Sequence, residues 1–562
     1  MSNSITKYKL SFLGKISSIQ DSIVLCYFPS SNSFIGEIVC FNENLNYKGI
    51  VFEISVNNVK IFLLNRDQKH LFIGDSISGL NETVKIKVGF YVLGNTITPF
   101  GEVLTSNVDN DNTLLSNLYE TEYCYFYNKS PSIIDRKKVS KPLLTGVNSI
   151  DCLFPIGLGQ RQLIIGDNNT GKTSLAVSTI LNQKRYNLNS KVRYYEYARY
   201  TYSKPCIYVF IGQKRSESIR IQQVLSRYDS TWYTSIIFSS SDDLPIIQYY
   251  APYTACVMGE WFMDKGFDSI LVFDDLSKHS VAYRQITLLL RRPPGREAFP
   301  GDVFFLHSKL LERSAQLSSN KGEGSMTSLP IIETLCGDLS SHIPTNVISI
   351  TDGQIFSNKE LLNRGVLPAV DLNLSVSRVG SSPQFKYMVS VSKKIKMQLA
   401  MYRQFKDAEL LGNDSNENIK TYVNRGKRLI NLFTQPLYHT QNFLKQVSYL
   451  FCLSEGFADN ISLKMTKFFL NSIFNMKFFT YLTSDVSILY IDLFRNTDVC
   501  EDHFSIMNSD VLHTKLYKLL FYYTIFSESN IVPVLNEIKN KVYIESLLSR
   551  FNDSFQLLFT YS

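Results

Sequence analysis

The 562-residue sequence lacks the cysteine spacing of a metal site or of a redox pair. Its nine cysteines are scattered along the chain, and no two of them stand at the separation that zinc ligands or a dithiol motif require. The sequence therefore gives no support to a cysteine-based metal centre. We expect buried, unpaired thiols in a reducing compartment.

Long apolar runs are missing as well. A membrane-spanning helix needs about 20 consecutive apolar residues. The nearest approach, residues 481–494, is short and contains Asp485 and Asp492, so we expect a core helix there. The N-terminal residues show neither the apolar core of a secretory signal nor the arginine-rich pattern of a transit peptide.

Charge is present only in moderate amount. Charged residues make up 19% and hydrophobic residues 44% of the chain, which fits a folded protein rather than a disordered one. The net charge of +8 is mild for this length and does not require a nucleic-acid partner. The basic loop RRPPGRE at 291–297 has no aromatic platform or basic stripe beside it, so we expect no nucleic-acid binding.

Aromatic residues, in contrast, are abundant at 13%, with 33 tyrosines and 38 phenylalanines but only two tryptophans. Asparagine, isoleucine and lysine are plentiful too. The codons of these residues are rich in A and T. This composition would suit a gene inside an organelle with a biased genome, although the same bias occurs elsewhere.

The pattern of apolar residues predicts three domains. Residues 1–95 alternate apolar and polar positions in short runs such as FIGEIVCF and NVKIFLL, which is typical of a small antiparallel β-barrel. Residues 96–385 alternate helical stretches with the apolar strands RQLIIGD, CIYVFIG, SILVFDD and NVISITDG, which predicts an α/β domain around a mainly parallel sheet. Residues 386–562 have helical patterns, with a polar break at 412–418.

A phosphate-binding loop follows the strand RQLII. Residues 166–173, GDNNTGKT, fit the pattern G-x-x-x-x-G-K-[ST], and a helical stretch follows them. The glycines let the backbone wrap phosphates with its N–H groups and with the N-terminus of the helix. The residues expected to contact a nucleotide here are Gly166, Asp167, Asn168, Asn169, Thr170, Gly171, Lys172, Thr173 and Ser174. A glycine loop with a purely structural role is the alternative.

Two further roles follow from the chemistry of this motif. Lys172 would reach the outer phosphates, and the Thr173 hydroxyl would bind Mg²⁺. The stretch SILVFDD ends in two carboxylates, and such a carboxylate normally holds Mg²⁺ directly or through water. Asp274 is the better candidate of the two, although a strand ending in aspartate is often a turn or a helix cap. The expected cofactors are ATP or ADP with Mg²⁺.

With these motifs in place, the sequence resembles the alpha subunits of F-type ATP synthases. The resemblance runs from about residue 14 to about residue 450 and is strong over 142–382. It is carried by VFDDLSKHSVAYRQITLLLRRPPGREAFPGDVFFLHSKLLERSA at 272–315, and by GQRQLIIGDNNTGKT, IPTNVISITDGQIF and LSVSRVGS. The family implies a β-barrel, a RecA-like P-loop domain and a helical domain. It also implies a hexamer that alternates with catalytic beta subunits, together with central-stalk and peripheral-stalk partners.

The resemblance implies a subunit that does not itself hydrolyse ATP. Gln213, in YVFIGQKRSES, stands where catalytic beta subunits carry a glutamate that polarises the attacking water. A glutamine cannot act as a base. Glu217, four residues further on, is a candidate replacement. A polar residue at a strand end, without a functional role, is the other interpretation of Gln213.

The resemblance also implies a role for Arg378. In LSVSRVGS it matches the family's arginine that reaches across an interface into the catalytic site of a beta subunit, where it stabilises charge on the γ-phosphoryl oxygens. Arginine fingers of this kind contribute about 10³–10⁵ in rate, and the planar guanidinium suits the role better than an amine. A structural arginine paired with a carboxylate is the alternative.

The sequence departs from the family pattern around the nucleotide. Asn168 and Asn169 replace an arginine and a glutamine of the family loop GDRQTGKT, while Leu367 and Leu437 replace an arginine and a glutamine near the adenine. The residues implied to remain at the base are Pro368 and Gln435. We expect phosphate binding to be intact and discrimination between purines to be poor, because the lost polar contacts weaken selectivity by at most a few kcal/mol.

The main hypothesis is a non-catalytic, regulatory nucleotide-binding alpha subunit of a rotary, proton-translocating ATP synthase. Its expected place is the matrix side of the mitochondrial inner membrane, where its association with the membrane would be indirect, through the complex. One rival is a self-sufficient homohexameric ATPase of the rotary or helicase-like kind, which would need a catalytic carboxylate near position 213. Another is a degenerate scaffold that binds nothing, against which the intact loop and Asp274 argue.

Three smaller expectations complete the sequence analysis. The match begins almost at once, so the family's N-terminal helix, which meets the peripheral stalk, is expected to be absent and replaced by another subunit. The stretches 468–479 and 512–526 have wide apolar faces, which would pack in a core or dock a lineage-specific subunit. His279 and His307 form no ligand cluster and are expected to be hydrogen-bonded structural residues.

Overall fold

The computed structural model describes residues 11–467 with gaps, and Leu470. The gaps lie at 28–32, 43, 56–57, 65–70, 107–120, 192–203, 411–416 and 460. The chain divides into two compact units, residues 1–463 and residues 464–562, and all elements described below belong to the first. Apart from Leu470, the expected helical stretches 468–479, 481–494 and 512–526, with their alternative as a docking face, lie outside the described residues.

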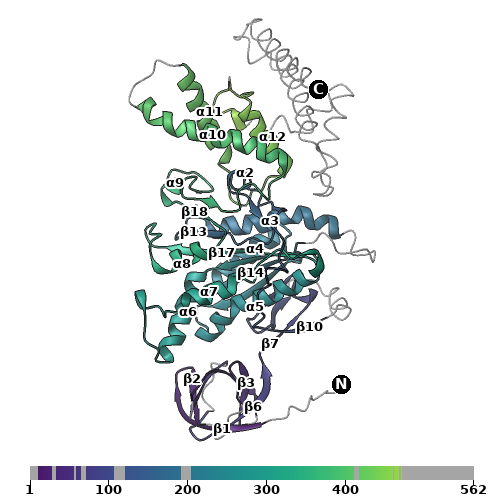
Figure 1. The fold of residues 1–562 in the computed structure, drawn as a ribbon, viewed down its shortest axis with the longest axis vertical. Coiled ribbons are helices and arrows are strands. Elements are labelled where there is room, and N and C mark those ends of the chain that lie inside the picture. The colour runs from purple at the N-terminus through teal and green to yellow at the C-terminus, as the bar shows by residue number, and fades with distance from the viewer. Residues whose placement is uncertain are drawn as a thin grey trace. The chain divides into compact units, whose positions relative to one another are not determined.

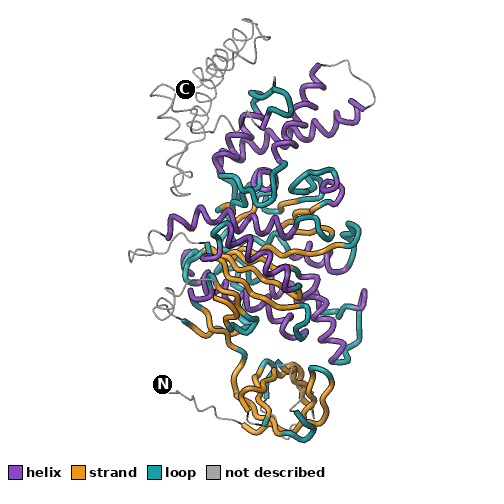
Figure 2. Tube along the Cα trace, turned by 180° about the vertical axis from the view of Figure 1, so that it is seen from behind, coloured by secondary structure: helices purple, strands orange, loops and turns teal. Residues whose placement is uncertain are grey.

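The N-terminal part is a closed six-stranded barrel (Figure 2). Its strand order is β1 (Ser11–Gln20), β2 (Ile23–Tyr27), β5 (Asn58–Leu63), β4 (Asn44–Ile54), β3 (Glu37–Phe41) and β6 (Ser76–Thr83), with every neighbouring pair antiparallel. Alternate apolar side chains, among them Val24, Val39 and Ile61, fill the interior because successive residues of a strand point to opposite faces. The predicted antiparallel barrel is confirmed.

The strands that follow the barrel belong to the next part of the chain. β7 (Lys85–Val88) pairs with β10 (Glu122–Tyr125). β8 (Asn95–Ile97) already joins the central sheet. The barrel strands therefore end at Thr83, and β8, the first strand of the chain to join the central sheet, begins at Asn95.

The central part is built on a nine-stranded sheet (Figure 1). Its order is β19 (Val376–Ser377), β18 (Gly353–Ser357), β13 (Leu163–Asp167), β17 (Ser325–Thr334), β16 (Asp268–Asp274), β14 (Cys206–Gln213), β15 (Thr234–Ser240), β8 and β9 (Val103–Ser106). The inner pairs are parallel, and the edge strands β19 and β9 are antiparallel to their neighbours. The continuous apolar run of β14 fits a strand covered on both faces.

Helices connect the parallel strands and cover the sheet. They are α2 (Asn148–Leu153), α3 (Lys172–Lys191), α4 (Arg215–Arg227), α5 (Pro245–Asp264), α6 (Leu276–Leu289), α7 (Val303–Leu311), α8 (His342–Ile350) and α9 (Lys359–Asn363). Short 3₁₀ turns accompany them in the described residues, at Phe90–Val92, Thr231–Tyr233, Arg296–Ala298 and Ser319–Lys321. A small pair of strands, β11 (Pro142–Leu143) and β12 (Ile156–Gly157), lies before the phosphate loop. The α5 helix is buried along nearly its whole length because it packs across β14, β15 and β16.

One predicted strand was wrong. The stretch NVISITDG was expected to be a strand, but its first five residues complete helix α8, and strand β18 begins only at Gly353. Ile343 and Val347, one helical turn apart, are the buried apolar positions of α8, and this spacing fits a helix and not the alternation of a half-buried strand. The run of branched residues favoured a strand locally, but the burial of Ile343 and Val347 on one face stabilises a helix.

The C-terminal part of the first unit is helical. It contains α10 (Lys386–Leu410), α11 (Glu417–Phe433) and α12 (Phe443–Ser454). Most of the predicted polar break at 412–418 lies outside the described residues. The α10 helix packs against α11 and α12. Within the described residues no helix is long and apolar enough to cross a membrane.

Among the described residues the cysteines form no disulfide, and most of them are buried in these cores. Cys26, Cys40, Cys152, Cys206, Cys256 and Cys452 are buried, and Cys124 is half-buried. Cys336 is exposed, against our expectation, because it lies just beyond the end of β17 in a turn with a positive φ of 53°. Cys500 lies outside the described residues.

His279 and His307 lie side by side in the core between α6 and α7. His279 stacks on Tyr249, with ring centroids 5.6 Å apart, and one of its ring nitrogens lies 3.1 Å from the Tyr249 carbonyl oxygen. His307 lies 3.3 Å from the Ser280 hydroxyl. Burial lowers the pKa of His279 to about 4 and the pKa of His307 to about 3, so both rings are neutral at physiological pH.

We expect this burial to make the fold sensitive to acid. An unfolded histidine titrates near pH 6.5, so between about pH 6.5 and about pH 4 only the unfolded chain protonates His279, and stability falls as the pH falls. His279→Phe keeps a ring on Tyr249 and removes the titration. Between about pH 7.5 and about pH 5.5 the variant should lose about 1.4 kcal/mol less unfolding free energy than the wild type in urea titrations. Equal losses would show that His279 does not titrate on unfolding.

Candidate functional site

The predicted phosphate loop lies at the carboxyl end of β13, immediately before α3. β13 runs between β17 and β18, so the loop opens at the edge of the sheet where these parallel strands end. Gly166 has no room for a side chain, because a Cβ there would meet the backbone oxygen of Ser357. Gly171 has a φ of 90°, which favours glycine, and Asn169 lies exposed in the left-handed region at 61°. The loop therefore has the backbone shape that phosphate wrapping requires.

Side chains of the loop are held by the loop's own carbonyl groups. The Lys172 amine donates to the carbonyl oxygens of Gly166 at 2.9 Å and of Asp167 at 2.5 Å. The Thr170 hydroxyl donates to Asp167 at 2.8 Å, and the Ser174 hydroxyl donates to Gly171 at 2.7 Å. Burial lowers the pKa of Lys172, while nearby carboxylates oppose that shift. Lys172 is thus a buried amine at the N-terminus of α3. A helix N-terminus with an amine beside it is suited to binding an anion.

Thr173 and Asp274 come together beside the loop. The Thr173 hydroxyl donates to the Asp274 carboxylate at 3.3 Å, and the Tyr208 hydroxyl donates to the same oxygen at 2.6 Å. Asp275 instead accepts from the Lys278 backbone N–H at 2.7 Å and caps α6. Burial raises the pKa of Asp274 and raises the pKa of Asp275 to about 7. The geometry separates the two aspartates, because Asp274 contacts Thr173 of the loop and Asp275 caps α6.

These groups suit Mg²⁺, which prefers oxygen ligands and keeps several waters. Thr173 supplies a hydroxyl and Asp274 a carboxylate, and both converge on one point. Among the described residues no group of three or more His, Cys, Asp or Glu side chains is placed to hold a metal ion. The donor set therefore fits a cation bound together with phosphates better than a cation held by protein alone.

The sequence analysis missed Glu333, the second-to-last residue of β17. It lies level with Gly166 in the sheet, between the loop strand and the Asp274 strand. With its amide nitrogen turned toward the carboxylate, the orientation that satisfies both groups, Asn168 donates to the two Glu333 oxygens at 2.6 and 2.7 Å. The stretch LPIIET could have identified Glu333, because it places a carboxylate near the end of an apolar run. The same feature identified Asp274.

Gln213 is engaged by a lysine that the sequence analysis also missed. Its side-chain oxygen accepts from the Lys278 amine at 2.6 Å, at the end of β14. Glu217, the candidate replacement base, forms an ion pair with Arg220 on the exposed face of α4 at 2.8 Å. Among the described residues, these polar interactions engage Gln213 with Lys278 and Glu217 with Arg220, and no hydrogen bond or ion pair joins either side chain to the phosphate loop.

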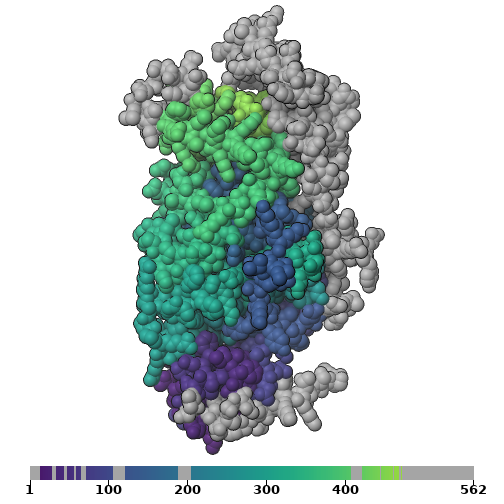
Figure 3. Space-filling view, viewed as in Figure 1, coloured from purple at the N-terminus to yellow at the C-terminus, as the bar shows by residue number. Residues whose placement is uncertain are grey.

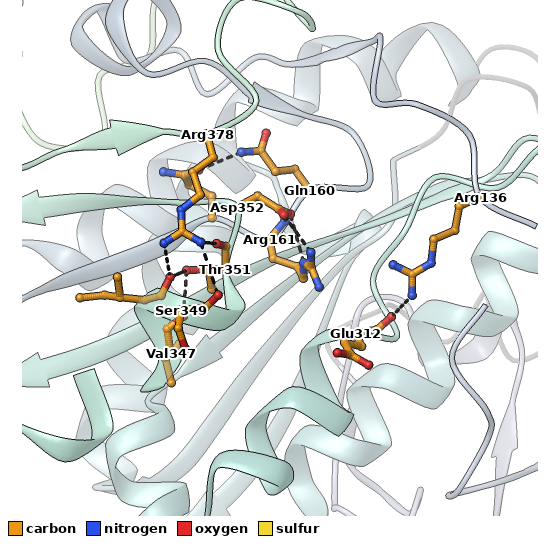
Figure 4. Close-up of polar contacts among 11 residues, drawn as sticks. Arg136, Gln160, Arg161, Glu312, Val347, Ser349, Thr351, Asp352 and Arg378 are labelled. Atoms are coloured by element: carbon orange, nitrogen blue, oxygen red, sulfur yellow. Dashed lines mark hydrogen bonds and ion pairs between the residues drawn. The ribbon is translucent and has the colours of Figure 1, made fainter. Parts of the chain in front are cut away.

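Arg378 lies directly after β19, at the surface. Its guanidinium donates to the carbonyl oxygens of Ile348 at 3.0 Å and Thr351 at 3.1 Å, at the end of α8 (Figure 4). Its partners are thus backbone carbonyls at the negative end of a helix and not a carboxylate. The neighbouring ion pair of Arg161 with Asp352, at 2.8 Å, lies beside it.

Arg378 and the phosphate loop lie at opposite ends of the sheet. The Arg378 N–H donates to the carbonyl oxygen of Asp352, the residue before β18, at 2.8 Å. The loop follows the other end of the neighbouring parallel strand β13, and the five residues of β13 span roughly 17 Å. The structure does not bring Arg378 to the nucleotide loop of its own chain.

Pro368 and Gln435 come together, but the Gln435 amide is already occupied. Its oxygen accepts from the Asn148 N–H at 2.8 Å, and its nitrogen donates to the Gly146 carbonyl oxygen at 3.2 Å. The Gln435 N–H donates to Leu367, the residue before Pro368. Gln435 therefore ties the end of α11 to α2. In the space-filling view, blue segments of the central part of the chain lie against green segments that come later in the sequence (Figure 3).

A cavity of about 610 Å³ opens beside the loop, on the side of α9. Asp167, Asn168 and Glu360 are among the residues that line it, whereas Lys172 and Thr173 are not. Its volume is typical of small-molecule pockets. The position of bound phosphates is nevertheless set by the loop and the α3 N-terminus, because the donors are there.

Comparison with known proteins gives two family matches. Residues 146–377 match the model "ATP synthase alpha/beta family, nucleotide-binding domain", and residues 384–487 match "ATP synthase alpha/beta chain, C terminal domain". Together these matches cover more than half of the chain. The first contains the loop, Gln213 and Asp274 and ends one residue before Arg378, and the second contains Gln435.

Curated relatives give the same result. The chain is 43% identical to the ATP synthase subunit alpha of Ehrlichia ruminantium (strain Gardel) over 456 residues, which is 81% of this chain and 86% of the relative. It is 41% identical to that of Rickettsia canadensis (strain McKiel) over 463 residues, 82% and 86% of the two chains. For Neorickettsia sennetsu (strain ATCC VR-367 / Miyayama) the identity is 42% over 449 residues, 80% and 84%. The chain belongs to the ATP synthase alpha/beta family, as an alpha subunit of the F type.

Proposed function

We propose that this alpha subunit binds Mg-ATP or Mg-ADP at its own loop without hydrolysing it, and that it lends Arg378 to the catalytic site of a neighbouring beta subunit. The observation that carries this proposal is the placement of Arg378 at the end of the sheet opposite the loop. An arginine there has no phosphate of its own chain within reach. It is exposed, as a residue that acts on a neighbour must be.

The lack of turnover rests on the groups around the loop. Gln213 cannot accept a proton from water, and its oxygen is held by the Lys278 amine. Glu217 is engaged with Arg220 at the surface. The self-sufficient ATPase would need a carboxylate at one of these places that is aimed at the loop. The scaffold that binds nothing is disfavoured by the buried Lys172 amine and by the meeting of Thr173 with Asp274.

Nucleotide and cation would use separate groups of this site. The loop backbone and Lys172 would hold the phosphates, and Thr173 and Asp274 would hold Mg²⁺, with Asp274 acting directly or through water. The bound cation would offset phosphate charge. Asp275 would stay with α6 as its cap.

We further propose that the site discriminates poorly between purine bases. Gln435 is one of the two residues implied to remain at the base. Its side-chain amide is hydrogen-bonded to the backbone of Gly146 and Asn148. Leu367 and Leu437 offer no hydrogen bonds from their side chains. Competition binding should show less than about a tenfold preference for ATP over GTP, the discrimination of roughly one hydrogen bond. A hundredfold preference would contradict this.

The partners follow from the family. We propose an alternating hexamer with beta subunits around a central-stalk subunit, with peripheral-stalk subunits beside it and an indirect association with the membrane. For the location we propose the matrix side of a mitochondrial inner membrane. The relatives named above are bacterial, so the mitochondrial placement rests on the composition of the chain alone. Fractionation of source cells, with immunodetection of the chain, tests it.

The binding part of the proposal is tested with Lys172→Met. We expect the wild type to bind a fluorescent ATP analogue at micromolar concentration in the presence of Mg²⁺. The variant should bind about 10- to 150-fold more weakly, the effect of losing a charged hydrogen bond. Lys184→Met is the matched control, since Lys184 lies on the same helix and pairs with Asp229 at the surface. Unchanged binding by Lys172→Met would contradict a nucleotide site at this loop.

A further inference from the structure

The Glu333 carboxylate lies next to the phosphate loop, where, among the described residues, it is hydrogen-bonded to Asn168 and not paired with a lysine or an arginine. Asn168 donates two hydrogen bonds to Glu333, and its amide carries no charge. In the part of the chain that the structure describes, no lysine or arginine forms an ion pair with Glu333. The Glu333 backbone N–H donates to the Ser277 hydroxyl at 3.1 Å, which fixes this end of β17 against α6. The negative charge of Glu333 is therefore held in place.

The charges around the loop are mostly negative. Four carboxylates act on the Lys172 amine, and they are Glu333, Asp275, Asp274 and Asp167, in decreasing order of effect. Lys278, the other cation nearby, is engaged with Gln213. Of these carboxylates, Glu333 has the largest electrostatic effect on the Lys172 amine. In loops of this kind, that amine reaches the outer phosphates.

We propose that Glu333, held by the neutral Asn168, makes this site prefer a nucleoside diphosphate to a nucleoside triphosphate. The inference rests on the proposed nucleotide binding and adds the class of nucleotide to it. The loop backbone, the cation ligands Thr173 and Asp274, and the base contacts serve both nucleotides alike. The third phosphate alone adds negative charge at the outer end, where Lys172 and Glu333 lie.

The size of the preference follows from electrostatics. One added pair of like charges near a protein surface changes affinity by about tenfold to a few hundredfold, depending on distance and solvent access. Glu333 is half-buried, so screening by water keeps the change in affinity near the lower end of this range. We expect Mg-ADP to bind about tenfold more tightly than Mg-ATP.

Two variants of the full-length chain test the proposal. Glu333→Gln removes the charge with little change of shape. Asn168→Arg supplies a guanidinium to the carboxylate, and the cavity beside Asn168 leaves room for the longer side chain. Glu360→Gln is the matched control, because Glu360 lines the same cavity from α9 and does not contact Asn168. Thermal melting of each variant checks that it folds.

The readout is the ratio of the dissociation constants for Mg-ADP and Mg-ATP, measured by displacement of a fluorescent nucleotide. Each test variant should strengthen ATP binding about tenfold and change ADP binding about twofold or less, whereas the control keeps the wild-type ratio. Wild-type affinity for ATP equal to or above that for ADP would overturn the inference and leave the proposed function standing. So would a Glu333→Gln variant that shifts both nucleotides equally. If the wild type bound neither nucleotide, the proposed function would fail and the inference with it.

Discussion

Replacing Arg378 by lysine in a reconstituted complex of this chain with a catalytic beta-type subunit should lower ATP turnover by about a thousandfold or more. An arginine finger stabilises charge that develops on the phosphoryl oxygens, and its fork of N–H donors matches those oxygens in a way that a single amine does not. The reduced rate should appear in steady-state hydrolysis of the mixed complex.

The structure of the chain shows how Arg378 is held. Its guanidinium rests on the carbonyl oxygens of Ile348 and Thr351 at the end of α8, and it remains exposed. A hydrogen bond to a backbone carbonyl is weaker than an ion pair, so a phosphate can displace these partners. The binding of nucleotide to the chain's own loop should be unaffected by the substitution, because the loop lies at the other end of the sheet.

Arg364→Lys is the control for the Arg378 experiment. Arg364 follows α9 at the surface and only weakly pairs with Glu360 at 3.8 Å. The mixed complex with this variant should keep its turnover within about twofold, as is usual for an exposed ion pair. Turnover of the Arg378→Lys complex within tenfold of the wild type would show that Arg378 is a structural residue.

The largest effect on stability is expected at Glu260. Its carboxylate in α5 accepts from Arg313 through two hydrogen bonds, one of them at 2.6 Å, and the two side chains are 8% and 2% exposed. Arg313 also donates to the Phe126 carbonyl oxygen at 3.0 Å, and Asn128 donates to Glu260 at 3.0 Å. The pair thus ties the segment around 126–128 to the central helices.

Glu260→Gln would leave the buried guanidinium without its counter-charge. Removing one partner of a buried ion pair costs about 3–5 kcal/mol, because the remaining charge cannot be solvated. The urea midpoint of the central domain should fall accordingly. Glu122→Gln, which breaks the exposed pair with Lys265, should leave the midpoint almost unchanged. A small shift for Glu260→Gln, similar to that of the control, would contradict the account of this pair.

Much of the fold could be predicted from local pattern. The barrel strand β5 starts with alternating polar and apolar residues, NVKI, and the buried strands β13, β14 and β16 contain continuous apolar runs, so these patterns are visible in short windows. The phosphate loop depends on backbone shape within eight residues, which the glycines specify. The helix at 342–350 was missed because its apolar residues are branched and its helical spacing appears only over the whole segment.

The contacts of the site could not be predicted in the same way. Asn168 of the loop contacts Glu333 near the end of β17, and Gln213 at the end of β14 contacts Lys278 of α6. The partners in each pair are far apart in sequence. Gln435 was expected at the nucleotide, and the sequence did not predict that its amide bonds to the backbone of Gly146 and Asn148, in one segment nearly 290 positions away along the chain. The spacing within a motif shows which functional groups are present, but the order of the strands in the sheet determines which of these groups are in contact.

The most direct test of the account is steady-state ATP hydrolysis by this chain alone and then with a catalytic beta-type subunit added. The account predicts no turnover by the chain alone, because Gln213 cannot serve as a base and Arg378 lies away from its own loop. It predicts turnover in the mixture. Robust hydrolysis by the chain alone, abolished by Lys172→Met, would show that the chain is an ATPase in its own right and would contradict the account.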